Sequence, residues 1–251
     1  MKIPKVEKPR IDVLMVERGL APSRERAQSM IMAGQVQVAG QRIDKPGTRI
    51  SADSQVEIVG QPLRYASRGG LKLEGALEDF GVTPDGKICL DAGSSTGGFT
   101  DCLLQQGASK VYAVDVTIAQ LDWKLQQDAR VVRIEKNARH LQAGDIADPV
   151  ALITADLSFI SVTKVLPALL SVAASGADLL ILIKPQFELE KRDVGKGGIV
   201  RDPALHERAV QGVVEAANRL GLEVVGVKPS KLPGAEGNQE FFLHAKTRRM
   251  E

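Results

Sequence analysis

Four charged residues are the first candidates for chemistry in this sequence: Lys72, Asp156, Lys184 and Glu240. Asp156 and Lys184 each follow an apolar stretch typical of a buried strand, Glu240 lies on another, and Lys72 precedes them all. Because the carboxyl ends of parallel strands meet at one edge of a sheet, we expect the four side chains to converge. A desolvated lysine amine flanked by a second cation holds its proton less tightly and can act as a general base, with carboxylates holding it in place. Each residue alone is more typical of a solvated rim, but the set of four predicts a catalytic site.

A glycine-rich turn is the second candidate and would bind a cofactor. The apolar strand 88–90 runs into Asp91 and then into glycines at positions 93, 97 and 98, which let backbone approach a ligand closely. A turn that cradles a pyrophosphate is spaced G-x-G-x-x-G, whereas this one is spaced G-x-x-x-G-G. The spacing favours a ligand without a pyrophosphate, and S-adenosylmethionine is the candidate.

Two polar residues follow the next strands. The strand 111–114 ends in Asp115, about twenty residues after the turn, as expected of a nucleotide-type α/β site. Asn137 follows the strand 131–134, where it could hydrogen-bond an adenine ring. An asparagine that caps a loop explains Asn137 nearly as well.

Strands and helices must alternate to bring these residues to one edge. The larger part of the chain predicts seven strands: 88–90, 111–114, 131–134, 152–155, 179–183, 223–227 and 240–244. Helices are expected over 73–80, 121–127 and 203–220. This alternation predicts a doubly wound, mostly parallel α/β sheet, closed by the last strand as an antiparallel one.

The composition is that of a globular protein of 251 residues, with 43% hydrophobic and 25% charged residues. This length suffices for one α/β domain and one small module. Cys89 and Cys102 have no metal-ligand spacing, so we expect core thiols and no metal. No signal-peptide pattern is present, and the uncharged run 165–177 is too short to span a bilayer. We therefore expect a soluble, cytoplasmic protein.

The amino-terminal part is basic. Residues 1–72 contain thirteen Lys and Arg against seven Asp and Glu, whereas residues 73–251 contain twenty against twenty-four. The pattern predicts a flexible tail to residue 9, helices over 10–19 and 24–33, and short strands at 36–38, 42–43 and 55–58. A compact basic module on a mildly acidic body indicates an anionic partner, although a solvated charged surface would look the same.

This module resembles an S4 RNA-binding domain. The resemblance rests on Arg10-Ile-Asp-Val-Leu14, Ser23-Arg-Glu-Arg-Ala27, Ala33-Gly34-x-Val36-x-Val38-x-Gly40 and Lys45-Pro46. It implies that the second helix and the following loop contact structured RNA. The implied RNA-binding residues are Arg10, Arg24, Arg26 and Lys45, to which we add Arg68. For each of them a plain surface position is the alternative.

The whole chain, over about residues 8–246, resembles the TlyA family, which joins an S4 domain to an FtsJ-like (RrmJ-type) methyltransferase domain. The resemblance rests on Arg68-Gly-Gly-x-Lys72-Leu, Asp91-x-Gly-x-Ser-Thr-Gly-Gly-Phe99-Thr-Asp, Ala113-Val-Asp115-Val, Ala155-Asp156-Leu-Ser-Phe-Ile-Ser161, Lys184-Pro-Gln-Phe-Glu188 and Gly237-Asn-x-Glu240-Phe. It implies an S4 domain at 8–62, a linker at 63–68 and a Rossmann-like methyltransferase domain at 69–248. That family 2′-O-methylates cytidines in ribosomal RNA with S-adenosylmethionine and often carries the label haemolysin.

The resemblance also implies roles for the candidate residues. Lys72, Asp156, Lys184 and Glu240 match the K-D-K-E tetrad of FtsJ-like enzymes; we expect Lys184 to be the base and Lys72 to orient. The cofactor is expected to contact Asp91, Gly93, Ser95, Thr96, Gly97, Gly98, Phe99, Asp115, Asn137 and Asp156. The basic segment Lys191–Arg201 could be a flap over RNA or cofactor, or an exposed loop.

The expected partners are 16S ribosomal RNA, 23S ribosomal RNA or both, together with the ribosomal subunits. We expect no membrane partner and no obligate protein partner. Two other functions remain open. The protein could be an RNA-binding ribosome assembly factor with an inactive methyltransferase body, against which the intact tetrad argues. It could also be a membrane-active haemolysin, although no spanning segment or strong amphipathic pattern supports pore formation.

Overall fold

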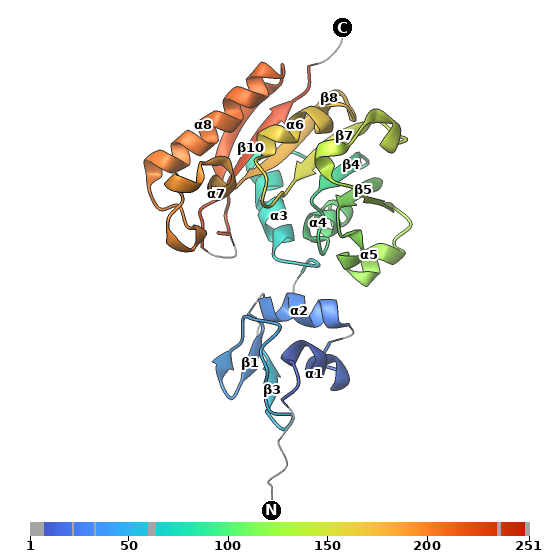
Figure 1. Cartoon of the computed structure of the whole chain (residues 1–251). Helices are drawn as coiled ribbons and strands as arrows, with labels where there is room; N and C mark the ends of the chain where they lie inside the picture. Colours follow the sequence, from blue (N-terminus) through green and yellow to red (C-terminus); the bar gives the residue numbers. More distant parts are fainter. Residues whose placement is uncertain (1–7, 22, 33, 60–63, 235–236, 249–251) are drawn as a thin grey trace, which may run out of the picture. The chain divides into compact units, whose positions relative to one another are not determined.

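The computed structural model describes residues 8–21, 23–32, 34–59, 64–234 and 237–248. The chain divides into two compact units, residues 1–68 and 69–251 (Figure 1). Residues 1–7 of the predicted tail, the end of the predicted S4 domain at 60–62 and residue 63 of the predicted linker lie outside the described residues. The predicted boundaries at 62 and 68 therefore stay predictions, although the division after Arg68 agrees with the second.

The amino-terminal unit contains two helices and a small sheet. Its elements are α1 (Ile11–Glu17), α2 (Arg24–Met32), β1 (Val36–Val38), β2 (Gln41–Arg42) and β3 (Val56–Ile58). The strands form an antiparallel sheet in the order β2-β1-β3. Apart from the ends of the elements, this is the arrangement that the sequence predicts.

Local sequence explains these elements. Gly19 and Gly34, which follow the two helices, both have a φ of 69°, which glycine adopts without strain. The Ser23 hydroxyl accepts a hydrogen bond of 3.2 Å from the backbone N–H of Arg26 at the start of α2, as an N-cap residue does. Apolar residues of both helices then pack under β1, with Ile11 and Ile31 fully buried.

A buried carboxylate also holds this unit together. Asp12 is completely buried and accepts hydrogen bonds from the side chains of Arg10, Arg24 (2.9 Å) and Gln28 (2.8 Å). Burial alone would raise the pKa of Asp12, but these donors outweigh it and hold the pKa well below its usual range. Asp12 therefore stays charged and ties α1 to α2.

The carboxy-terminal unit contains a seven-stranded sheet in the order β6-β5-β4-β7-β8-β10-β9. Its strands are β4 (Ile88–Ala92), β5 (Lys110–Asp115), β6 (Val131–Glu135), β7 (Val150–Ala155), β8 (Ala173–Ile183), β9 (Glu223–Pro229) and β10 (Phe241–Lys246). All pairings are parallel except those of β10, which runs antiparallel to both β8 and β9. The predicted doubly wound sheet with an antiparallel closing strand is confirmed.

The strand order reverses at the centre of the sheet. From β4 the chain winds outward through β5 and β6 and then returns to the other side of β4 as β7. Ligands of doubly wound sheets bind at such a reversal, outside the carboxyl ends of the strands. The glycine-rich turn after β4 and the loop after β7 both leave the sheet there.

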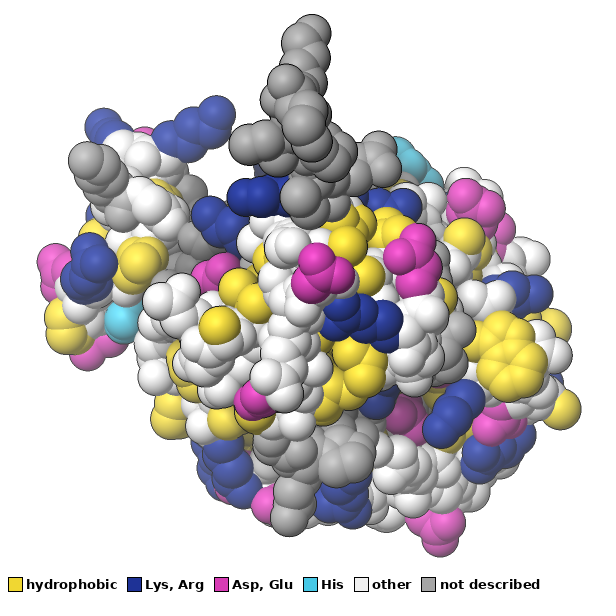
Figure 2. Space-filling view, turned by 90° about the horizontal axis from the view of Figure 1, so that it is seen from below, with side chains coloured by type: hydrophobic (Ala, Val, Ile, Leu, Met, Phe, Trp, Pro, Cys, Tyr) yellow, Lys and Arg dark blue, Asp and Glu magenta, His cyan; other side chains and the backbone are white. Residues whose placement is uncertain are grey.

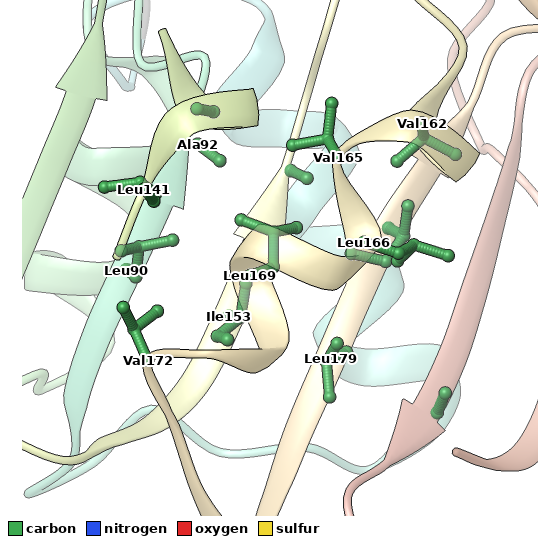
Figure 3. Close-up of a cluster of buried hydrophobic side chains, with 14 of the residues drawn as sticks. Leu90, Ala92, Leu141, Ile153, Val162, Val165, Leu166, Leu169, Val172 and Leu179 are labelled. Carbon is green, nitrogen blue, oxygen red and sulfur yellow. The ribbon is translucent and has the colours of Figure 1, made fainter. Parts of the chain in front are cut away.

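Helices cover both faces of the sheet. They are α3 (Gly69–Phe80), α4 (Gly98–Gln105), α5 (Trp123–Gln127), α6 (Leu166–Leu170), α7 (Pro185–Glu188) and α8 (Pro203–Arg219) (Figure 1). Helices α6 and α8 pack on one face, where Leu166 and Leu169 lie with Leu90, Ile153 and Leu179 (Figure 3). Helices α3 and α4 pack on the other, through ring contacts from Phe80 and Phe99 to residues of β10.

Short 3₁₀ turns lie between these elements, and the start of α5 corrects a prediction. They are η1 (Ile118–Gln120), η2 (Ala138–His140), η3 (Ala143–Asp145), η4 (Val162–Lys164), η5 (Lys191–Asp193) and η6 (Lys196–Gly198). The helix predicted over 121–127 begins only at Trp123, because Asp122 caps it by accepting a hydrogen bond from Lys124 N–H. In the described part of the chain, no helix is long and apolar enough to cross a membrane.

We expect Asp12→Asn to destabilise the amino-terminal unit by about 1–3 kcal/mol, because Arg10, Arg24 and Gln28 lose the buried, charged acceptor of their hydrogen bonds. Since the folded-state pKa of Asp12 is depressed, its stabilising contribution is present above about pH 4 and is lost as the pH falls below that value. Native-state hydrogen exchange of the α1 amides measures this. Tryptophan fluorescence would not, since Trp123, the only tryptophan, lies in the other unit. Equal protection in Asp12→Asn and in the exposed-site control Asp53→Asn would contradict the assignment.

Candidate active site

Two lysine–carboxylate ion pairs form the centre of the candidate site. Lys72 Nζ, on α3, lies 2.5 Å from Glu240 Oε2, and Lys184 Nζ, after β8, lies 2.5 Å from Asp156 Oδ1. The lysine side chains are only 11% and 12% exposed. The structure thus joins the four sequence-predicted residues two by two, one lysine to one acid in each pair.

The strand register places both pairs at the same edge of the sheet. Ala155, the last residue of β7, lies beside Ala92 at the end of β4, so Asp156 emerges next to the glycine-rich turn. Ile183, the last residue of β8, lies opposite Phe241, the first of the antiparallel β10. Lys184 and Glu240 therefore leave neighbouring strands at the same end as Asp156.

Ser158 is a further contact that the sequence reasoning missed. Lys184 Nζ donates a hydrogen bond of 3.0 Å to Ser158 Oγ. Asp156 Oδ1 is buried and close to Lys184 Nζ, but no hydrogen bond of good geometry reaches it, so the contact is an ion pair. The position of Ser158, two residues after the acid in the same loop, was the only available signal.

The glycine-rich turn packs tightly against the loop after β7. Gly93 has a φ of 85°, and a Cβ at this position would lie 2.4 Å from the backbone oxygen of Asp156. Gly97 has a φ of 95°, and its Cβ would lie 2.2 Å from a methyl carbon of Leu125. Both positions therefore require glycine, for backbone conformation and for space.

Asp115 connects the end of β5 to this turn. Its carboxylate accepts hydrogen bonds from the backbone N–H groups of Ser95 (2.9 Å) and Thr117 (2.8 Å). The Thr117 hydroxyl also donates to Oδ1 (3.0 Å), and because each carboxylate oxygen can accept about two hydrogen bonds, capacity for a ligand hydroxyl group remains at Oδ2. Ser94 Oγ in the same turn is buried and has no hydrogen-bond partner among the described residues. These features fit a ligand that carries its own polar groups.

Asp91 points into the protein. It is completely buried and accepts hydrogen bonds from the hydroxyls of Thr100 (2.7 Å) and Thr154 (3.4 Å). Burial raises the pKa of Asp91 to about 7, the bond from Thr100 opposes this, and the nearby Asp156 charge adds to it. In this arrangement Asp91 ties α4 to β7; its predicted contact with the cofactor stays a prediction.

Other predicted cofactor residues make contacts within the protein. Asn137 is exposed, and its side chain accepts a hydrogen bond of 3.0 Å from Arg139 N–H, which is the loop-capping alternative. Phe99 is buried, with its ring stacked at 6.1 Å on Phe242, and Gly98 begins α4. The Thr96 carbonyl accepts a hydrogen bond from Asp122 N–H. Contacts of these residues with a cofactor remain predictions.

The predicted RNA-binding arginines of the amino-terminal unit have protein partners. Arg10 and Arg24 both pair with Asp12, although each side chain is at least 40% exposed. Arg26 donates a 3.3 Å hydrogen bond to the Ala66 carbonyl, Lys45 is exposed and Arg68 half-buried. On the face shown in Figure 2, Lys and Arg lie among acidic and hydrophobic side chains rather than in one continuous patch.

Asn238 anchors the glycine-rich basic segment near Glu240 and was also missed. It is buried, accepts a hydrogen bond of 2.9 Å from Val200 N–H and donates one of 2.9 Å to the Gly198 carbonyl. His206 Nε2 lies 2.9 Å from the Val200 carbonyl, so both backbone groups of Val200 are engaged. The end of the segment predicted as a flap is thus fixed next to the site.

We expect Asp91→Asn to remove a pH dependence of stability. Because the pKa of Asp91 is about 7 when folded and about 3.9 when unfolded, the folded state binds more protons between these values. The unfolding free energy of the native protein should therefore fall by up to about 1.4 kcal/mol per pH unit from about pH 4 to 7, relative to the variant. Urea denaturation of both proteins at pH 5 and pH 7.5 measures this, and a constant difference would contradict it.

Comparison with known proteins agrees with this architecture. The FtsJ-like methyltransferase family matches residues 65–247, and the S4 domain matches residues 9–56. A Mycobacterium tuberculosis protein named 16S/23S rRNA (cytidine-2'-O)-methyltransferase TlyA is 49% identical over 240 residues, which are 95% of this chain and 90% of that protein. Hemolysin A of Brachyspira hyodysenteriae is 42% identical over 94% of this chain and 98% of its own.

A solved structure has the same two-part organisation. A hemolysin-type protein from Streptococcus thermophilus matches with a TM-score of 0.76 and 42% identity, over 97% of this chain and 90% of that chain. The match therefore spans both the small basic unit and the α/β unit. From its S4 domain, its FtsJ-like domain and these relatives, the chain belongs to the TlyA family of FtsJ-like methyltransferases.

Proposed function

We propose that the protein is an S-adenosylmethionine-dependent methyltransferase that modifies the ribose 2′-oxygen of cytidine in 16S or 23S ribosomal RNA, or in both. The observation that carries the proposal is the presence of two lysine–carboxylate pairs at the sheet edge where the glycine-rich turn lies. The name of the Mycobacterium tuberculosis relative supports the choice of substrate.

The ion pairs suit the activation of a hydroxyl group. A ribose 2′-hydroxyl is a weak nucleophile until its proton is removed, and Lys184, once neutral, can accept that proton at Nζ. Asp156 and Ser158 fix the direction of this amine. Reacting atoms that are held about 3–3.5 Å apart can lower the barrier by ~7–11 kcal/mol. In the proposed mechanism, positioning of the ribose oxygen against the methyl carbon therefore supplies most of the acceleration.

The structure favours Lys184 over Lys72 as the base. The two lysines are almost equally exposed, so their own burial does not distinguish them. Their partners differ, since Glu240 is 3% exposed whereas Asp156 is 23% exposed. The Lys184 pair is therefore more open to a substrate, and the Lys72 pair is closed and suited to orient the site.

The residues around the turn fit S-adenosylmethionine. When bound, this cofactor supplies a sulfonium methyl group as the electrophile. Gly93 and Gly97 allow the tight backbone of the turn, and Asp115 can accept a hydrogen bond from a ribose hydroxyl of the cofactor at Oδ2. In the proposed site, Asn137 follows β6, the strand that pairs with β5, which ends in Asp115. Asp156 borders the glycine-rich turn.

Ribosomal RNA and the ribosomal subunits are the proposed partners. The amino-terminal unit carries the positive charge excess, and 78 residues of the chain are 35% identical to the small ribosomal subunit protein uS4 of Streptomyces avermitilis. Arg10, Arg24, Arg26, Lys45 and Arg68 are the proposed phosphate contacts. The protein would accordingly act in the cytoplasm, where ribosomes are found.

The two alternative functions make different predictions. An assembly factor with an inactive body would bind subunits without transferring a methyl group. A membrane-active protein, as the name of the Brachyspira relative implies for that protein, would release dye from liposomes. Radiolabelled methyl transfer to isolated subunits, run beside a liposome leakage assay on the same preparation, distinguishes all three.

We expect Lys184→Ala to retain S-adenosylmethionine binding and to lose methyl transfer by about 10²–10⁴-fold, the usual contribution of a general base. Titration calorimetry measures binding, and nucleoside mass spectrometry of subunits from cells lacking the gene measures transfer. The matched control is Lys110→Ala, which breaks a lysine–aspartate pair of 2.6 Å at the start of β5, the opposite edge of the sheet. Unchanged turnover in Lys184→Ala would remove this residue from the mechanism.

A further inference from the structure

The loops that follow β7 and β8 contact each other at two separate points. The first is the ion pair between Asp156 and Lys184. The second lies at the far end of both loops, where Glu188 meets Ser161 and Val162. The second point contains none of the four residues of the K-D-K-E set.

Glu188 uses both oxygens of its carboxylate at this second point. Oε2 accepts a hydrogen bond of 2.5 Å from the Ser161 hydroxyl, and Oε1 accepts one of 2.9 Å from the Val162 backbone N–H. Val162 begins the turn η4, and Ser161 is its N-cap. Because the first N–H groups of a helical turn need acceptors, the carboxylate completes the capping of η4 from another segment. Burial raises the pKa of Glu188, as expected for a carboxyl group away from water.

A single turn of helix connects the two points. Lys184 is the N-cap of α7, Pro185 is its first residue and Glu188 its last. Phe187 N–H donates to the Lys184 carbonyl and Leu189 N–H donates to the Pro185 carbonyl, so the turn is closed by its own hydrogen bonds. A movement of Glu188 is therefore transmitted to Lys184 through a short, rigid segment.

An aromatic contact lies between the two points, at Phe159, which is itself 92% exposed. The rings of Phe159 and Phe187 are 5.4 Å apart and tilted. Phe159 has a φ of 66°, a left-handed conformation that costs a bulky residue about 1–3 kcal/mol and persists only where its surroundings enforce it. Contacts on both sides of Phe159, from Lys184 to Ser158 and from Glu188 to Ser161, provide that enforcement.

We propose that Glu188 is a positioning residue for the reaction: by holding Ser161 and Val162, it keeps the loop after β7 in the place where Asp156 and Ser158 direct the Lys184 amine. This inference rests on the proposed function of the site. Glu188 acts through Lys184 and does not itself contact the reacting atoms. Its loss should therefore lower the rate of methyl transfer more than the affinity for S-adenosylmethionine.

The test compares three variants on the same segment. Glu188→Ala removes both acceptors, whereas Glu188→Gln keeps an acceptor for Val162 N–H and a hydrogen-bonding group for Ser161. Glu190→Ala is the matched control, because among the described residues the Glu190 side chain pairs with Arg192 alone, in an exposed ion pair. The first readout is kcat and KM with ribosomal subunits and S-adenosylmethionine. The second is the acetylation rate of Lys184 by acetic anhydride, relative to Lys231, measured by peptide mass spectrometry.

For Glu188→Ala we expect kcat to fall about tenfold or more, since a misplacement of 1 Å can cost about a hundredfold, with KM for S-adenosylmethionine nearly unchanged. Lys184 should be acetylated about tenfold faster, because its amine is released from Asp156 and Ser158. Glu188→Gln and Glu190→Ala should both behave as the native protein. A Glu188→Ala protein that is folded and equals Glu190→Ala in both readouts would overturn the proposal.

Two further outcomes remain decisive. If Glu188→Ala does not fold, Ser161→Ala takes its place, since it removes one of the two donors; native acetylation and native kcat in Ser161→Ala would overturn the proposal. If the native protein transfers no methyl group, the proposed function fails. The acetylation rates of Lys184 still decide whether Glu188 positions that amine, because they need no substrate.

Discussion

Asp156 is the residue on which the geometry of the site depends. Its backbone N–H donates to the Ala92 carbonyl at the end of β4, its backbone oxygen fills the space where a side chain of Gly93 would be, and its carboxylate meets Lys184. One residue thus contacts the cofactor turn through its backbone and the candidate base through its side chain. In the proposed mechanism, Asp156 therefore fixes the separation between the turn 93–98 and Lys184.

The ion pairs have a physical cost that the fold must offset. Two lysines and a glutamate that are 12% exposed or less have lost most of their hydration, and such charges are stable only when paired and hydrogen-bonded. The pairing serves chemistry as well as stability, because an amine held by a carboxylate has one direction. Ser158 and, at a distance, Glu188 restrict the Lys184 pair further.

Much of this could be predicted from the sequence because it depends on local or repeating patterns. Apolar runs in the sequence predicted parallel strands, and parallel strands place their carboxyl ends together. Four candidate residues follow such runs: Asp91, Asp115, Asp156 and Lys184. Helix ends at Gly19 and Gly34 followed from the preference of glycine for positive φ. The antiparallel last strand, which carries Glu240 to the same edge, was also predicted.

What could not be predicted depends on side-chain partners that are distant in sequence. Nothing local indicates that Lys72 pairs with Glu240, 168 residues away, or that Asp91 turns inward to Thr100. Nothing local showed that Arg10 and Arg24, the predicted phosphate contacts, both pair with the buried Asp12. Glu188 and Asn238 belong to motifs of the sequence, but the hydrogen bonds that they form could be identified only in the folded chain.

The most direct test of the central claim is an experimental structure of the protein with S-adenosylhomocysteine, the demethylated cofactor. We predict that its sulfur lies over the turn 93–98, with Lys184 Nζ about 5–7 Å from the sulfur. This distance leaves room for one methyl group and for one ribose oxygen within hydrogen-bond reach of Lys184. A bound molecule at another edge of the sheet, or one separated from both lysines by the protein itself, would contradict it.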